Sequence, residues 1–255
     1  MKILLLGCGN IGKALLSAWS REDVLVVQPS LSCAAEFPKA QFIADLSQTR
    51  EIDFKPDIIV CAIKPQMFNC IADRIGLYIK DSLFVSVMAG VKINRLEFEN
   101  NRAVRIMPNI AIQAGHSVNL SVAGEKITDE DVAKINAMLD GTGLTVWLNT
   151  EEQLDFLTTI FGSGPAYVYL FMELMVSQTV NTGVDLDTAT AMVRELLAGC
   201  ACTNGDFEGL RKSVTSKGGC TEVALKVLKP SFDNSMKEAI KASLTRLNEL
   251  NENRN

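Results

Sequence analysis

The feature that most constrains this chain is a glycine-rich stretch close to its N-terminus. An apolar run, KILLL, is followed by GCGNIG, whose glycines have the spacing G-x-G-x-x-G. A helical pattern begins within this stretch. In that context the first glycine allows a tight turn, the second lets a pyrophosphate approach the backbone, and the third lets helix and strand pack closely. A glycine-rich turn without a ligand is the alternative. The spacing favours a dinucleotide site at Gly7, Gly9, Asn10, Ile11 and Gly12, where N–H groups at the helix start face the phosphates.

Short apolar runs alternate with helical patterns over the first half of the chain. Near-continuous apolar strands that alternate with helices are typical of a parallel, doubly wound sheet. A helix is predicted before the last strand. Thr128 is its candidate N-cap, Asp131 lies three residues further on, and Gly141 stands past its end. The apolar runs span residues 2–6, 23–27, 57–63, 82–91, 102–110, 116–124 and 144–148.

The pattern changes after Asn149, where no convincing strand remains. Helical stretches follow, with Pro165 suited to a first turn, Gly183 to a C-cap, and further helices beginning near Asp187 and Phe232. We therefore expect an α/β fold in two domains. Residues 1–149 form a Rossmann-type doubly wound sheet, and residues 150–255 form an all-α C-terminal domain.

One stretch interrupts the helical half. In VTSKGGCTEVALKVL, residues 214–228, two adjacent glycines precede a cysteine, a threonine and a helical run. The stretch is either a plain helix-to-helix turn or an anion-binding helix N-terminus, since the first N–H groups of a helix have no partner within it.

Composition narrows the classes of function. With 47% hydrophobic residues the chain can bury a substantial core, and a net charge of −5 argues against non-specific nucleic-acid binding. The N-terminal apolar run is too short for a signal peptide, and we expect no stretch of membrane-spanning length. Seven cysteines without a CxxC pair indicate reduced thiols, and His116 is the only histidine. We expect a cytoplasmic protein with no metal, nucleic-acid or membrane partner.

The second strand ends without the acidic residue that NAD-binding domains usually carry there. Gln28, Pro29 and Ser30 stand at this place, so no carboxylate repels a 2′-phosphate, and NADPH is favoured, with NADH as the alternative. No arginine or lysine adjoins this strand end. Lys64, in the segment AIKP at another strand end, either contacts the cofactor or is an ordinary solvated lysine.

Four stretches in order resemble the pyrroline-5-carboxylate reductase family over nearly the whole chain. They are GCGNIGKALL, AIKP, SVMAGV with RIMPN, and GSGPAYVYLFMELM with VTSKGGCTEVAL. The resemblance implies reduction of 1-pyrroline-5-carboxylate to L-proline by NAD(P)H, the last step of proline biosynthesis. It also implies a homodimer formed through the helical domain, and larger rings of dimers occur in the family.

The resemblance also implies roles for individual residues. Thr221 is the implied catalytic residue, where it offers a hydroxyl to the imine nitrogen. The implied substrate-binding residues are Ser216, Gly218, Gly219, Cys220 and Thr221. The implied cofactor-binding residues are those of the glycine loop together with Ser30, Ala62, Ile63, Lys64, Pro65, Ala89 and Gly90.

Three features depart from the family pattern. Lys217 stands where proline is usual, Ile110 and Ala111 replace threonine and proline, and the second Rossmann helix near residues 31–36 is short. Two alternatives remain open. One is another Rossmann imine or β-hydroxyacid reductase, although residues 162–173 lack the catalytic lysine of the hydroxyacid enzymes. The other is a nucleotide-sensing homologue without turnover.

Overall fold

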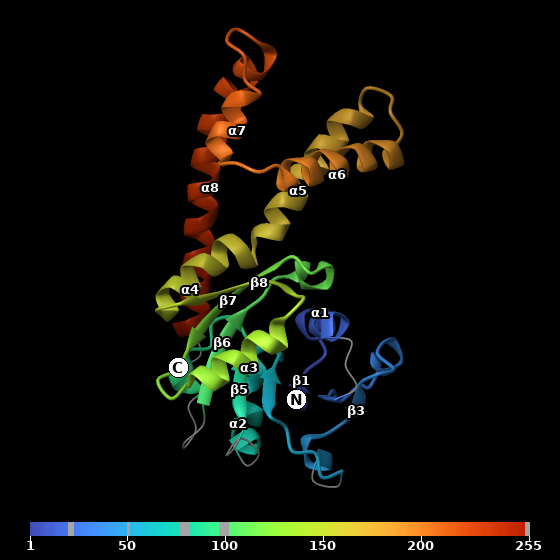
Figure 1. Ribbon diagram of the computed structural model, residues 1–255, viewed down its shortest axis with the longest axis vertical. Coiled ribbons are helices and arrows are strands. Elements are labelled where there is room, and N and C mark those ends of the chain that lie inside the picture. Colours follow the sequence, from blue (N-terminus) through green and yellow to red (C-terminus); the bar gives the residue numbers. More distant parts are fainter. Residues whose placement is uncertain (20–22, 50–51, 77–81, 97–101, 253–255) are drawn as a thin grey trace. The chain divides into compact units, whose positions relative to one another are not determined.

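The computed structural model describes residues 1–19, 23–49, 52–76, 82–96 and 102–252 (Figure 1). The chain forms two compact units. The first contains Met1–Pro165 and Leu244–Asn255, and the second contains Ala166–Ser243. The expected domain boundary at residues 149 and 150 lies within the first unit and stays a prediction.

The first unit is built on one eight-stranded sheet with the order β3-β2-β1-β4-β5-β6-β7-β8. All neighbouring strands are parallel except β6 and β7, which are antiparallel. The predicted fold class, a Rossmann-type sheet followed by a helical region, is confirmed. The strands are β1 Ile3–Leu6, β2 Val24–Val27, β3 Gln41–Ile43, β4 Ile58–Cys61, β5 Leu83–Ser86, β6 Arg102–Met107, β7 Ser117–Ala123 and β8 Gly143–Leu148.

Two details of the sheet differ from the expectation. The strand β3 was not predicted, because its three residues are too few to show a pattern. The expected parallel arrangement is wrong for β7, which runs against β6. Only residues 108–116 separate these two strands, and they contain the short turn η5 (Ile110–Ala114) and Gly115 at φ 73°. A parallel connection needs a crossover of a dozen or more residues, so this chain must reverse direction.

The two faces of the sheet bury alternate residues of each strand. Ile3 and Leu5 of β1 belong to a core with α1 (Asn10–Trp19) and α3 (Asp129–Leu139). Leu4 and Leu6 belong to the opposite core with α2 (Phe68–Gly76). Successive side chains of a strand point to opposite faces, so the continuous apolar strands are explained by helices on both sides.

Short turns replace helices at several connections. The segment after β2 holds only the 3-10 turn η1 (Ala34–Glu36), so the short second Rossmann helix is confirmed. The predicted cap of α3 is also confirmed, because Thr128 and Asp131 bond each other's backbone N–H groups in a capping box. The other turns of this part are η2 Leu46–Thr49, η3 Pro65–Met67 and η4 Ile93–Arg95.

A buried cluster of charges fixes the first helix after the sheet, α4 (Glu151–Leu157). Arg105 of β6 is 1% exposed, and it donates to Glu151 and, at 2.9 Å from Nη2 to Oδ1, to Asp155. Lys92 reaches the other oxygen of Asp155 at 3.3 Å. A buried cation is tolerated only with such partners, so these contacts determine where α4 lies on the sheet.

Helices make up the second unit. α5 (Gly164–Val180) enters it from a π-helical turn, η6 (Thr158–Gly162), and α6 (Leu186–Cys202), α7 (Phe207–Ser213) and α8 (Cys220–Glu252) follow. The predicted helices are present, although α7 was not predicted. The expectation of a separate last helix near Phe232 is wrong, because α8 continues through Pro230.

The second unit buries little of its own apolar surface. Ala189 and Val193 are its only buried residues, and the structure describes every residue of this unit. Leu170 and Leu174 of α5 are 57% and 56% exposed. The helical run Glu151–Val180 is 30 residues long and contains an 18-residue window with a mean hydropathy of 1.2, so by length and composition alone it is long and apolar enough to cross a membrane. The expectation that no stretch reaches this length is therefore wrong.

Candidate functional site

The glycine loop between β1 and α1 has the geometry that a dinucleotide requires. Gly7 has φ +93°, and a Cβ there would lie 2.9 Å from the Ala62 carbonyl oxygen. A Cβ on Gly12 would lie 2.4 Å from the Gly7 carbonyl oxygen, so helix and loop approach too closely for any side chain. A Cβ on Gly9 would meet no atom within 4 Å. The space over Gly9 is therefore open to a pyrophosphate, and the loop fits a dinucleotide.

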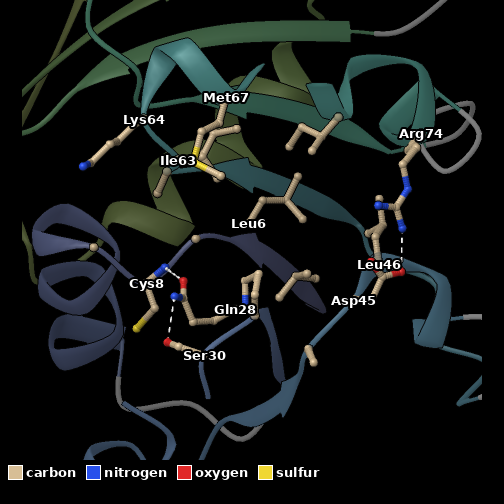
Figure 2. A pocket seen from close by; sticks show the side chains of 17 residues that line it. Leu6, Cys8, Gln28, Ser30, Asp45, Leu46, Ile63, Lys64, Met67 and Arg74 are labelled. Atoms are coloured by element: carbon tan, nitrogen blue, oxygen red, sulfur yellow. Dashed lines mark hydrogen bonds and ion pairs between the residues drawn. The ribbon is translucent and has the colours of Figure 1, made fainter. Parts of the chain in front are cut away.

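A pocket of about 460 Å³ opens beside this loop (Figure 2). It lies at the carboxyl ends of β1 to β4, where the strand order reverses and open α/β sheets bind their ligands. Six of the predicted cofactor residues line it, namely Gly7, Gly9, Ser30, Ala62, Ile63 and Lys64. The other walls come from residues that follow β2 and β3 and from one side of η3 and α2.

The remaining predicted cofactor residues lie outside this pocket. Asn10, Ile11 and Gly12 form the first turn of α1, and Pro65 begins η3. Ala89 and Gly90 form the turn after β5, with Gly90 at φ 71°. The nicotinamide role of this turn stays a prediction.

Hydrogen bonds connect the glycine loop to the end of β2. The Cys8 N–H donates to Gln28 Oε1 at 2.9 Å, and Gln28 Nε2 donates to Ser30 Oγ at 3.2 Å. Ser30 Oγ lies 3.0 Å from Ser32 Oγ. This strand end presents an amide and hydroxyl groups, which do not repel a phosphate as a carboxylate would.

Sequence analysis missed two charged residues of the pocket. Arg74 of α2 lines it, and its Nη2 lies 2.5 Å from Oδ1 of Asp45, which follows β3. Arg74 lies with Asp45, which follows β3, rather than at the end of β2, and it comes from a helix distant in sequence. The available signal was helical spacing, since Met67, Ile71 and Arg74 recur on one side of η3 and α2.

The glycine pair before α8 forms a tight turn. Gly218 has φ +75°, and its N–H donates to Glu222 Oε2 at 2.5 Å. That bond, together with Lys226, lowers the pKa of the Glu222 carboxyl. The Gly219 N–H donates to the Ser216 carbonyl oxygen at 3.1 Å.

The first turn of α8 keeps donors that the turn does not use. The N–H groups of Cys220 and Thr221 have no hydrogen-bond partner within the described parts of the chain. Both residues are exposed. Unpaired N–H groups at the positive end of a 33-residue helix attract anions. Whether this stretch is an anion site or a plain helix-to-helix turn stays a prediction.

The fold and the glycine loop define the chain as a Rossmann-type NADP oxidoreductase. Residues 2–90 match the family model "NADP oxidoreductase coenzyme F420-dependent", and residues 151–250 match "Pyrroline-5-carboxylate reductase dimerisation". The chain belongs to the pyrroline-5-carboxylate reductase family. Within the described residues, no group of three or more metal-ligating side chains is placed to hold a metal ion.

Similar proteins span most of the chain. Pyrroline-5-carboxylate reductase 2 of Bacillus subtilis is 34% identical over 77% of this chain and 73% of its own length. The pyrroline-5-carboxylate reductase of Vibrio alginolyticus is 26% identical over 98% of this chain and 97% of its own. The solved structure of the Plasmodium falciparum pyrroline carboxylate reductase, with NADP bound, has a TM-score of 0.87 at 25% identity and covers 98% of both chains.

Proposed function

We propose that this chain reduces 1-pyrroline-5-carboxylate to L-proline, the last step of proline biosynthesis, with NADPH as the donor and NADH as the alternative. The observation that carries the proposal is the open first turn of α8, with the free N–H groups of Cys220 and Thr221. This turn lies inside the segment that matches the reductase dimerisation model. A small substrate with a carboxylate is the kind of ligand such a turn holds.

The glycine loop holds the cofactor in this proposal. The N–H groups of Asn10, Ile11 and Gly12 bind the pyrophosphate across the open face of Gly9. Ser30 lies near the adenosine ribose or its phosphate, and Ala62 to Pro65 lie along the cofactor. Ala89 and Gly90 flank the nicotinamide. When bound, NADPH supplies the hydride that adds to the imine carbon.

The substrate residues have separate tasks. The turn from Ser216 to Cys220 holds the carboxylate, with Gly218 and Gly219 shaping it. Thr221 offers its hydroxyl to the imine nitrogen, which gains a proton as the amine forms. An ordinary threonine is a weak acid, so Thr221 acts by hydrogen bonding and orientation, and the proton comes from water or from an iminium substrate.

We further propose residues 1–149 as the cofactor domain and residues 150–255 as the substrate and dimerisation domain of a cytoplasmic homodimer. The exposed apolar residues of α5 support a partner chain, since a contiguous apolar surface of this kind usually marks an interface. A ring of dimers is the larger assembly to test, by sedimentation of the purified protein.

Substitution of Thr221 tests the proposed mechanism. Thr221→Ala should lower kcat about 10²-fold, because one positioned hydrogen bond to the reacting group is lost. Thr221→Ser should keep most of the activity, and NADPH affinity should be unchanged in both variants. The measurement is NADPH oxidation with 1-pyrroline-5-carboxylate, alongside fluorescence titration of NADPH. Full activity in Thr221→Ala would remove the residue from its proposed role.

The same assay separates the two alternatives. A nucleotide-sensing homologue would bind NADPH without turning over the pyrroline substrate. A hydroxyacid reductase would oxidise NADPH only with hydroxyacid or keto substrates. The proposal expects oxidation with the cyclic imine, and comparison of NADPH with NADH establishes the preferred donor.

A further inference from the structure

The ion pair between Asp45 and Arg74 stands at one end of the dinucleotide pocket, where neither residue has an assigned role. In Figure 2 the pair lies on one side of the cavity, while Lys64 and Ser30 lie away from it. Between them the walls are apolar and include Ile63, which a flat aromatic base can pack against. The pocket thus combines an apolar slot with a charged pair at its end.

The carboxylate of Asp45 is held firmly and keeps one oxygen available. Ser47 donates to Oδ1 from its N–H at 2.9 Å and from its hydroxyl at 2.6 Å, and Arg74 donates to the same oxygen at 2.5 Å. These bonds lower the pKa of Asp45, Ser47 contributing more than Arg74. In the described part of the chain, Oδ2 accepts no hydrogen bond. An ionised, oriented acceptor therefore faces a ligand that offers an N–H.

We infer that Asp45 and Arg74 recognise the adenine base, with Asp45 Oδ2 accepting from its exocyclic amino group and Arg74 donating to ring nitrogen N7, which remains an acceptor when an oxygen replaces the amino group. Adenine presents this amino donor beside a ring-nitrogen acceptor on one edge, which matches a carboxylate beside a guanidinium. This inference rests on the proposed cofactor site.

The alternative ligand for Arg74 is the 2′-phosphate of NADPH. The pair argues against it, because the guanidinium charge is already matched by Asp45 and the carboxylate would repel a phosphate at the same place. The hydroxyl groups of Ser30 and Ser32 at the end of β2 suit the phosphate better. If Arg74 contacts the adenine base, it contributes equally to the binding of NADPH and NADH. If it contacts the 2′-phosphate, it contributes to NADPH alone.

The test compares NADPH with its deamino analogue, in which hypoxanthine replaces adenine and an oxygen replaces the amino group. Titration of the wild-type protein should give a Kd about tenfold or more higher for the analogue, since a charge-assisted hydrogen bond is replaced by repulsion. Equal affinities would overturn the inference, and this comparison needs no variant.

Variants then assign the effect to the pair. In Asp45→Asn the side-chain amide can donate to the new oxygen, so the two affinities should come within about threefold. Asp53→Asn is the matched control, because Asp53 is 88% exposed and outside the pocket, and it should keep the wild-type ratio. An unchanged ratio in Asp45→Asn would refute the role of Asp45.

Arg74→Gln separates base from phosphate. The inference expects NADPH and NADH to be weakened by the same factor, whereas a selective loss of NADPH would assign Arg74 to the phosphate and overturn the inference. Measuring turnover of 1-pyrroline-5-carboxylate separates the inference about the adenine base from the proposed reaction. Base selectivity without reduction of the pyrroline would contradict only the proposed reaction, and reduction without base selectivity would contradict only the inference.

Discussion

The glycines of the loop have different physical reasons to be glycine. Gly12 has no room for a Cβ, since the Gly7 carbonyl oxygen would be 2.4 Å away, whereas Gly9 has open space in the protein itself. Gly12 is therefore required for folding, whereas Gly9 is required only when a ligand is bound. A single added methyl group can therefore separate stability from cofactor binding.

We predict opposite outcomes for the two alanine variants. Gly12→Ala should lower the free energy of unfolding by about 1–3 kcal/mol, because backbone atoms must shift. Gly9→Ala should leave the Tm unchanged or slightly higher while raising the Kd for NADPH about tenfold or more, since a methyl group occupies the pyrophosphate approach. Thermal unfolding and NADPH titration check both. Unchanged NADPH affinity in Gly9→Ala would contradict the phosphate role of the loop.

The cysteines differ in protonation and exposure. Burial raises the pKa of the Cys61 thiol to about 12 and, together with its neighbour Cys33, that of Cys8 to about 12. Cys70 is exposed. A raised pKa keeps a thiol protonated, and only the thiolate reacts as a nucleophile.

Alkylation should follow this difference. Iodoacetamide at pH 8 should modify Cys70 within minutes while Cys8 and Cys61 stay unmodified, because pH 8 lies well below the pKa of about 12 of both thiols. Peptide mass spectrometry of the native protein measures this, with urea-unfolded protein as the control in which all three react. Early labelling of Cys61 in native protein would show that its site opens readily.

Sequence could identify the glycine loop but not the pair of Asp45 and Arg74. The loop is a local pattern whose spacing carries its chemistry. Asp45 and Arg74 are 29 positions apart, and they meet only because β3 and α2 reach the same edge of the sheet. Helical spacing places Arg74 on one side of α2, but no pattern in the sequence pairs it with Asp45, so only the folded chain brings the two charges together.

Whole elements were predictable where a pattern or a cap was long enough. The helix α3 has a full capping box and was predicted correctly, whereas β3 has three residues and was missed. A separate helix was expected from about Phe232, just after Pro230, a residue type that lacks an N–H and usually ends a helix. The structure carries the helix through this position, so the surrounding 33-residue helix outweighs the local cost of one proline.

The buried charges under α4 test how this element is held. Asp155 is 8% exposed and contacts both Arg105 and Lys92. Asp155→Ala should lower the free energy of unfolding by about 3 kcal/mol, because it leaves buried Arg105 short of a partner. The matched control is Glu152→Ala, whose 81% exposed carboxylate lies 3.8 Å from Lys92, and it should change the free energy of unfolding far less than Asp155→Ala. Urea denaturation compares the two, and equal effects would contradict an anchoring role for Asp155.

The helical unit leaves most of its apolar side chains exposed. Ala189 and Val193 are the only buried residues of this fully described unit, which therefore has no core of its own, and α5 is apolar over most of its circumference. An apolar helical run of this kind is compatible with packing inside one chain and with a dimer interface. A single chain does not distinguish these two roles, because the residues of an interface stay exposed until a second copy binds. The match of residues 151–250 to a dimerisation model explains why apolar side chains remain exposed here.

A charge placed on α5 should therefore separate the subunits. Leu170 is 57% exposed, and Leu170→Glu would bury a carboxylate in an apolar interface, where an unpaired charge is strongly unfavourable. We expect sedimentation equilibrium to show loss of the dimer at micromolar concentration, with a Tm that depends on protein concentration. The control is Leu144→Glu, the same substitution at a leucine of β8 that is 63% exposed, and it should leave the dimer intact. A dimer that survives Leu170→Glu would show that α5 does not form the interface, because one glutamate there should cost far more than the 1.4 kcal/mol of a tenfold change in Kd.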